Sequence, residues 1–185
     1  MCIDGTPIAL VHPSPDERAR CEAQLRAALS LVDRYAPRAA RTLKRLQVGV
    51  LVFGTDWALG AYYRDAALIK LKEQFVFDSG TSATALASLL VHELTHAWLE
   101  EHGVSYIEPR RARIERICFR AEVVFAARAP EGDQLLPRLR RHLSRPASYW
   151  SEAAFTDRAR DELSALGFPR WIVSVLFRVY RRRVV

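Results

Sequence analysis

The segment Thr81–Glu101 reads TSATALASLLVHELTHAWLEE and has the apolar periodicity of a long helix. Its apolar positions form two stripes on nearly opposite sides, and the second stripe includes two histidines. A helix that is apolar on all sides is normally buried, so we predict a buried helix here. The members of the two stripes are Leu86, Leu90, Leu94, Ala97 and Trp98, and Ala85, Leu89, His92, His96 and Leu99.

The polar residues of this helix are its most informative part. In His92-Glu93-Leu94-Thr95-His96 the two histidines lie ~40° apart around a helix of ~3.6 residues per turn, so both imidazoles can reach one metal ion. Glu93, rotated ~100° from His92, can contact a water on that ion without binding the ion itself. This HExxH pattern is typical of zinc hydrolases, in which the glutamate is the general base.

A metal ion would also satisfy three polar groups whose burial would otherwise be costly. An unpaired buried polar group costs ~1–3 kcal/mol. The alternative is a chance match, in which the two histidines bond to carbonyl groups of the core.

A third ligand is expected on the next helix, because catalytic zinc generally takes three protein ligands and keeps a fourth position for water. Gly103 is in the position that glycine favours just after a helix end. A loop follows, and a second helix is predicted from near Pro109 to about Arg128. Glu115 and Glu122 share one face of it, so an antiparallel pair of helices would bring one of them back to the histidines.

The spacing of these residues resembles that of the gluzincins, the superfamily of thermolysin and many zinc aminopeptidases. Eighteen residues separate His96 from Glu115, and the resemblance spans about 35 residues, 89–125. It implies that His92, His96 and Glu115 bind Zn²⁺ and that Glu93 is the general base. It also implies a zinc metallopeptidase that acts on a peptide or protein substrate.

The chain departs from the gluzincin pattern at two positions near the third ligand. Ile114 and Phe119 stand where family members commonly have Asn and Asp, and the exopeptidase signature of the aminopeptidases is absent. The resemblance therefore implies the metal site more directly than the substrate. Glu122 stays open as an alternative third ligand or as a residue that orients a ligand. Cys118 is expected to be a small core residue.

Two segments before the long helix have strand character. Residues 47–53 are β-branched and apolar, and residues 66–72 alternate apolar and basic side chains. Residues 75–77 are expected to continue this strand or to form a short third one. Residues 60–71 resemble a sheet edge that binds an extended peptide by strand addition. An ordinary edge strand whose lysines block aggregation fits equally well.

The rest of the chain is expected to be helical. We therefore predict one zincin-like α+β domain over residues 1–185, with a small sheet packed on a mainly helical body. The further helices are predicted at Pro15–Ala36, Pro37–Leu46, Gln134–Ser144, Trp150–Leu166 and Pro169–Arg183.

Composition predicts a globular cytoplasmic protein. Half of the residues are hydrophobic, no signal peptide follows Met1, and no apolar run approaches the ~20 residues of a membrane span. The three cysteines, Cys2, Cys21 and Cys118, are odd in number and widely spaced, which favours a reducing compartment.

The net charge of +7 raises a second hypothesis, that of a partner with negative charge. Arginine contacts phosphate well, but neither arginine cluster comes with a nucleic-acid-binding motif, so solvated helix faces are the stronger interpretation. The same charge also agrees with a peptide or protein substrate that carries negative charge. The clusters are Arg138, Arg140, Arg141 and Arg145, and Arg178, Arg181, Arg182 and Arg183.

The function expected from the sequence is peptide hydrolysis with zinc and Glu93. Such a site needs a donor for the developing oxyanion, and Tyr106, Tyr149 and His142 are the candidates. The alternatives are a zinc-binding protein without activity and a basic helical interaction protein without zinc. The substrate and the oligomeric state are left open.

Overall fold

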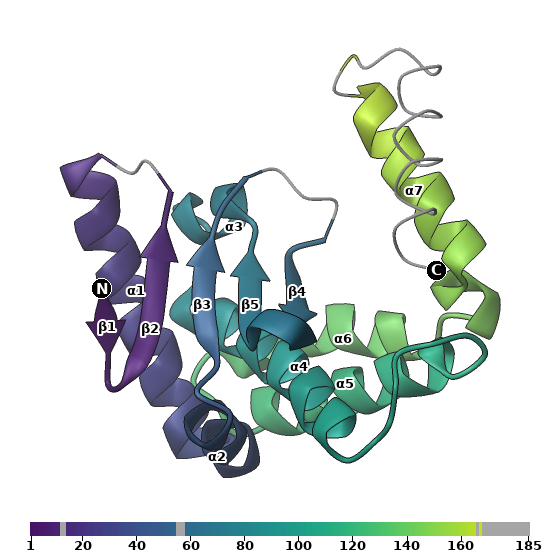
Figure 1. The fold of residues 1–185 in the computed structure, drawn as a ribbon, viewed down its shortest axis with the longest axis horizontal. Helices are drawn as coiled ribbons and strands as arrows, with labels where there is room; N and C mark the ends of the chain where they lie inside the picture. Colours follow the sequence, from purple (N-terminus) through teal and green to yellow (C-terminus); the bar gives the residue numbers. More distant parts are fainter. Residues whose placement is uncertain (12–13, 55–57, 166, 168–185) are drawn as a thin grey trace.

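The fold is built on a five-stranded mixed sheet, seen in a computed structural model that describes residues 1–11, 14–54, 58–165 and 167 (Figure 1). The strand order is β1-β2-β3-β5-β4. The strands β2, β3 and β5 run parallel, and β1 and β4 pair antiparallel with their neighbours. The strands are β1 (Cys2–Ile3), β2 (Thr6–Leu10), β3 (Gly49–Val52), β4 (Gly60–Tyr63) and β5 (Leu68–Leu71).

Seven helices among the described residues complete an α+β structure, so the predicted class is confirmed. The helices expected before residue 166 are all present, with slightly shorter bounds, whereas the one expected at 169–183 lies outside the described residues. They are α1 (Pro15–Tyr35), α2 (Pro37–Arg45), α3 (Glu73–Phe77), α4 (Ala83–Glu101), α5 (Arg111–Ala126), α6 (Leu136–Leu143) and α7 (Glu152–Ala165), with the 3-10 turns η1 (Arg64–Ala66), η2 (Gly132–Gln134) and η3 (Ala147–Trp150).

The helices α1 and α4 cover one face of the sheet, which lies in front of them in Figure 1. Ser14 begins α1 with a capping box that it shares with Glu17, and Pro15 occupies the first turn. The inward face of α1 consists of five residues, all of them buried in the core that α1 shares with α4 and the sheet. They are Cys21, Leu25, Ala28, Leu29 and Val32.

The helix α4 is buried as predicted, and its end directs the chain toward α5. Leu86, Leu90 and Leu94 are fully buried. Gly103 has φ +77°, its N–H bonds to the carbonyl of residue 100, and the N–H of residue 104 bonds to that of Leu99. This Schellman arrangement satisfies carbonyls left open by the helix end, and glycine adopts the left-handed conformation without strain.

The predicted sheet edge at residues 60–71 consists of two strands. In the described sheet β4 lies at the edge, whereas β5 is inside, between β3 and β4. A turn at η1 joins them into an antiparallel pair with Tyr62 opposite Ile69. Within this segment, residues 60–63 therefore form the outer edge of the described sheet.

The strand predicted at residues 75–77 is wrong. These residues belong to the short helix α3, which buries Val76 completely in the core beside α1. Since β5 ends at Leu71 opposite Val52, where β3 also ends, residues 75–77 lie beyond the ends of both described strands. The β1–β2 hairpin was not predicted. It turns at Asp4 and Gly5, both at positive φ, and Pro7 interrupts its strand pattern.

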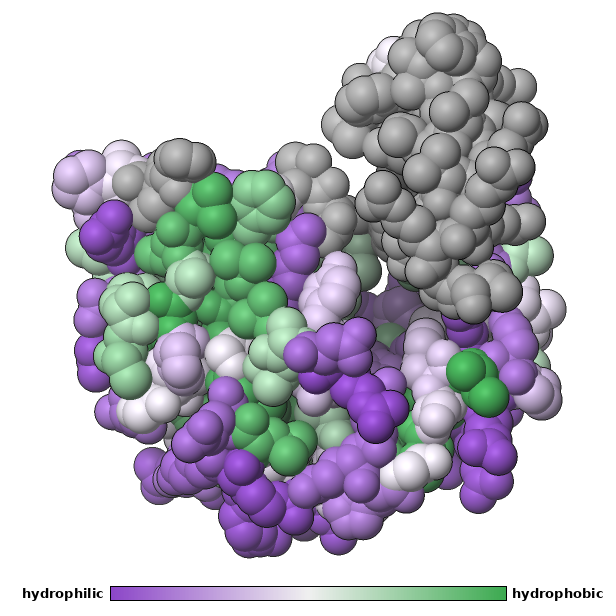
Figure 2. All heavy atoms as spheres, in the orientation of Figure 1, coloured by the Kyte–Doolittle hydropathy of each residue, from purple (hydrophilic) through white to green (hydrophobic). Residues whose placement is uncertain are grey.

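The other face of the sheet carries much of the hydrophobic surface visible in Figure 2. Phe53, directly after β3, is 44% exposed, and Tyr63, at the end of β4, is 47% exposed. The residues of the predicted metal site lie instead on α4 and α5, on the helical side of the sheet.

Candidate metal centre

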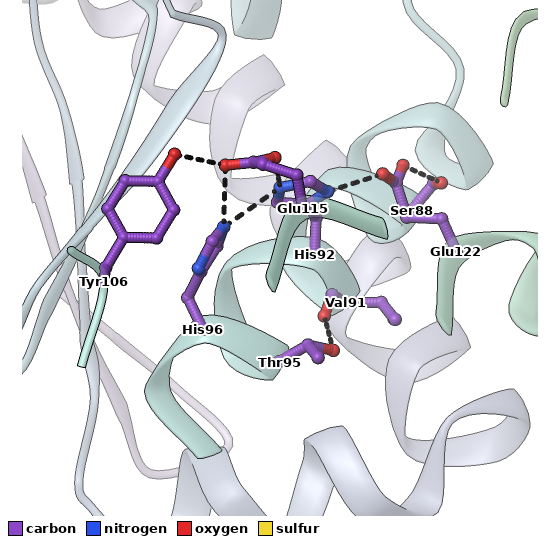
Figure 3. Close-up of polar contacts among 8 residues, drawn as sticks. All are labelled: Ser88, Val91, His92, Thr95, His96, Tyr106, Glu115 and Glu122. Carbon is purple, nitrogen blue, oxygen red and sulfur yellow. Dashed lines mark hydrogen bonds and ion pairs between the residues drawn. The ribbon is translucent and has the colours of Figure 1, made fainter. Parts of the chain in front are cut away.

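Two histidines project from α4 toward the same point, one turn apart (Figure 3). The Nε2 atoms of His92 and His96 are 3.2 Å apart. His92 is buried and His96 is half-buried, so the surrounding helices restrict both rings. The predicted convergence of the two imidazoles is therefore present in the fold.

The helix α5 runs back along α4 and brings Glu115 to the two histidines. One carboxylate oxygen lies 3.4 Å from Nε2 of His92, and the other lies 3.6 Å from Nε2 of His96. The hydroxyl of Tyr106, in the loop between the helices, donates a hydrogen bond to Glu115. Figure 3 shows the carboxylate lying above both rings.

The separations among these three groups match those of ligands around one small ion. In a tetrahedral site with bonds of ~2.0 Å, ligand atoms lie ~3.3 Å from one another. The corresponding distances in this structure are 3.2, 3.4 and 3.6 Å. The three side chains therefore have the spacing needed to bind an ion together.

Cys118 is a further possible ligand, one turn after Glu115 on α5. His92, His96 and Cys118 have ligand atoms within 4.8 Å of one another, so this buried group could hold a metal ion. Burial and the nearby carboxylates raise the pKa of the Cys118 thiol well above its usual value, which favours the neutral form when no ion is bound. Glu115 suits a ligand better, because its carboxylate oxygens lie 3.4 and 3.6 Å from the Nε2 atoms of the two histidines and its pKa is about 2.

Glu122 contacts the outer nitrogen of His92 rather than the centre of the group. Its Oε1 lies 2.7 Å from Nδ1 of His92, and the hydroxyl of Ser88 donates to its Oε2 at 2.7 Å. This pair turns Nε2 of His92 toward His96 and Glu115 (Figure 3). A carboxylate on the outer nitrogen is the usual support of a histidine ligand. Ser88 was not predicted as part of the site, although it lies four residues before His92 and therefore on the same face of the helix.

Glu93 is buried directly under the edge strand β4. It is 5% exposed, and a Cβ added at Gly60 would lie 3.1 Å from its Oε1. The backbone N–H of Tyr62 donates to the carboxylate. Burial, together with repulsion from Glu115 and Glu122, raises the pKa of Glu93 to about 7.

The pKa values of His92, His96 and Glu115 are shifted because these groups are buried close together in a site where carboxylates outnumber imidazoles. Burial lowers the pKa of His96 to about 4, and the charge of His92 adds to this effect. Burial opposes ionisation of Glu115 and protonation of His92, but their mutual contacts outweigh it. They hold the pKa of Glu115 at about 2 and raise that of His92 well above its usual value. With Glu93 and Glu122, three carboxylates surround two imidazoles, an arrangement that favours a bound cation.

The three candidate oxyanion donors lie at different distances from this centre. Tyr106 contacts it directly, with its ring edge-on to His96 at 5.1 Å. His142 stacks on Phe119 at 4.6 Å, and the ring of Phe119 in turn meets His92 at 4.8 Å. Tyr149 lies between two guanidinium groups, those of Arg145 and Arg158, at 4.0 and 4.1 Å. Of the three candidates, Tyr106 therefore contacts the predicted ligands directly. His142 is separated from His92 by the ring of Phe119, and Tyr149 contacts arginines and not the predicted ligands.

Several other expectations concern surfaces rather than this centre. Arg138, Arg140 and Arg141 lie on α6, and Arg145 follows it, whereas the cluster at 178–183 is outside the described residues. The cysteines are unpaired, with Cys2 exposed and the other two buried. Within the described residues, each helix is too short or too polar to span a membrane.

Comparison with protein-family models, with curated proteins and with solved structures gives no match to this chain. Any functional assignment therefore has to come from the geometry and chemistry of its own residues.

The substitution Glu93→Gln tests the electrostatics of the centre in metal-free protein. The pKa of Glu93 is about 7 in the folded state, against 4.5 as the reference value. The protonated carboxyl thus contributes stability that is full below pH 4.5 and is lost as the pH rises through 7. We expect Glu93→Gln to raise the free energy of unfolding by about 2–3 kcal/mol at pH 8.5 and to change it little at pH 4.5.

Urea unfolding in the presence of a chelator measures this difference. The matched control is Glu101→Gln, on the surface of the same helix. An equal effect of Glu93→Gln at both pH values would contradict the assigned pKa, because a packing effect would not depend on pH.

Proposed function

We propose that this chain is a zinc-dependent metallopeptidase in which His92, His96 and Glu115 bind the metal and Glu93 is the general base. The observation that carries the proposal is the convergence of the three ligand side chains at 3.2 to 3.6 Å. Two imidazoles and one carboxylate form a ligand set used by catalytic zinc sites, which leave a fourth position open.

The support around His92 favours this assignment over one in which Glu122 is the third ligand. A histidine that binds metal through Nε2 needs its proton on Nδ1, and Glu122 is placed to accept a hydrogen bond there at 2.7 Å. Glu122 is itself held by the hydroxyl of Ser88. Its two oxygens are thus engaged in positioning the ligand.

The fold also supplies a place for an extended peptide. In the described sheet, β4 has a neighbouring strand on one side only, and its Gly60 lies over the side chain of Glu93. A peptide that added to β4 through main-chain hydrogen bonds would pass close to Glu93 and to the ligands on α4. The zincin-like fold and the peptide substrate proposed here both rely on this arrangement of edge strand and helix.

In the proposed reaction, each residue has a defined task. Bound zinc would supply Lewis-acid chemistry, polarising the scissile carbonyl and acidifying a water molecule. Glu93 would take a proton from that water as it attacks the carbonyl carbon and would then give the proton to the leaving amine as the C–N bond breaks. With zinc bound, Glu93 would have a lower pKa than in the metal-free protein, which favours its ionised form as a base. Tyr106, beside Glu115 and His96, is the best-placed donor to the developing oxyanion.

The substitution Glu122→Gln tests the positioning of His92. We expect it to weaken zinc binding about 10–100-fold, because the amide is a poorer partner for the Nδ1 proton than the carboxylate. Competition with a chromogenic zinc chelator gives the affinity, and Glu101→Gln is the surface control. Unchanged affinity in Glu122→Gln, with the fold intact by circular dichroism, would contradict this role.

Peptide hydrolysis is tested with Glu93→Gln, which removes the base without removing a ligand. We expect zinc-loaded wild-type protein to cleave members of a quenched fluorescent peptide library. In Glu93→Gln with equal zinc content, the rate should fall about 10²–10⁴-fold. Zinc-loaded wild-type protein that cleaves no peptide would favour the alternative of a zinc-binding protein without activity. Equal rates in the two proteins would remove Glu93 from the mechanism.

A further inference from the structure

A second feature of the molecule is a groove on the far side of α4 from the metal ligands. It has a volume of about 420 Å³ and is lined by residues of α2, α4 and α5 and of the segment just before α2. These three helices lie together on the helical side of the sheet (Figure 1). At ~100° per residue, its residues Val91, Leu94 and Trp98 on α4 point ~100–160° away from His92 around the helix. Its apolar floor includes Val91, Leu94, Trp98, Ile117, Ala121 and Val124.

Both walls of this groove carry exposed arginines. Arg38 and Arg41 come from α2 on one side, and Arg120 and Arg128 come from α5 and its end on the other. None of the lining residues that the structure describes is acidic. In the part of the chain that the structure describes, the side chains of Arg41, Arg120 and Arg128 form neither a hydrogen bond nor an ion pair. The groove is thus an apolar strip between two rows of largely uncompensated positive charge.

The groove is continued by a second cavity, of about 570 Å³, that shares four of its lining residues. This cavity adds Lys44 and Arg45, which are ion-paired with Asp33 and Glu101 outside its described lining. Along α5 the groove runs from Ile117 to Arg128, which at ~1.5 Å per residue corresponds to ~16 Å, about three helical turns. The strip is therefore long, and its unpaired positive charge comes from the arginines of α2 and of α5 and its end.

The floor contains apolar surface that the described residues leave open to solvent. Val124 is 51% exposed, although it lies in the middle of the strip on α5. Trp98 is partly buried and lies under the guanidinium of Arg38 at 5.1 Å. Aromatic and arginine side chains are the residues most often responsible for binding energy at protein interfaces.

We propose that this groove binds an acidic amphipathic helix of a partner protein. Leucine-like side chains of one face of that helix would fill the strip, and glutamates or aspartates on either side of this face would pair with the two arginine rows. An anionic amphiphile with a single charged head fits less well, because the positive charge lines both walls rather than one end. The proposal is independent of the metal centre and of peptidase activity.

The test uses a fluorescein-labelled helical peptide of about five turns, with leucines at i, i+3, i+4 and i+7 and glutamates beside them. Fluorescence anisotropy with the full chain gives its dissociation constant. Two control peptides have the same leucine positions with lysines in place of glutamates, or the same composition in scrambled order. We expect binding of the acidic peptide and binding at least about tenfold weaker for both controls.

Three variants locate the binding on the protein. Val124→Asp and the pair Arg41→Glu/Arg120→Glu are expected to weaken binding of the acidic peptide by about tenfold or more. The matched control is Arg18→Glu/Arg20→Glu, which makes the same change of net charge on exposed positions of α1. We expect this control to change the dissociation constant by less than about threefold at 150 mM salt.

Two results would overturn the proposal. One is equal weakening by the α1 pair and the groove pair, which would indicate attraction by net charge alone. The other is binding of dodecanoate, lost in Val124→Asp, by a protein that does not bind the acidic peptide; this would identify a site for a single-headed amphiphile.

Discussion

The hydrogen-bonded chain Ser88–Glu122–His92 is the interaction on which the candidate centre depends. It joins α4 to α5 inside the protein, with two contacts of 2.7 Å that engage both oxygens of one carboxylate. Glu122 is 3% exposed, so this chain is shielded from water, and leaving one of its groups unpaired would be costly. It determines which nitrogen of His92 faces His96 and Glu115. The packing of α4 against α5 thus orients the candidate ligand His92.

Much of this arrangement could be predicted from helical periodicity. The burial of α4, the convergence of His92 and His96 and the return of α5 with Glu115 all follow from spacing along two amphipathic or apolar helices. The sequence favoured Glu115 as the third ligand but left Glu122 open as an alternative, because both lie on the same face of α5. Only the depth at which the helices cross decides which nitrogen of His92 each carboxylate meets. The β1–β2 hairpin and α3 were missed because short elements depend on tertiary packing more than on local pattern.

The helices α4 and α5 serve two surfaces at once. One side of each contributes to the candidate metal centre, and the other side forms the floor of the arginine-lined groove. Val91 and His92 are neighbours in sequence but belong to the groove and to the centre, respectively. A helix apolar on all sides, which was the first signal in the sequence, is thus explained by two uses: packing against α1 and the sheet, and exposure of a strip at the groove. Occupation of the groove would contact the same two helices that hold the ligands.

The central claim is that His92, His96 and Glu115 bind one zinc ion, and metal stoichiometry tests it most directly. Inductively coupled plasma mass spectrometry of zinc-loaded, desalted protein should give about one zinc per wild-type chain and per Cys118→Ser chain. The same measurement should give little zinc for His96→Ala and Glu115→Ala, with circular dichroism confirming that each variant is folded. Loss of zinc in Cys118→Ser with retention in Glu115→Ala would replace the proposed ligand set by the two histidines and the cysteine. Wild-type protein that holds no zinc after loading would contradict the account as a whole.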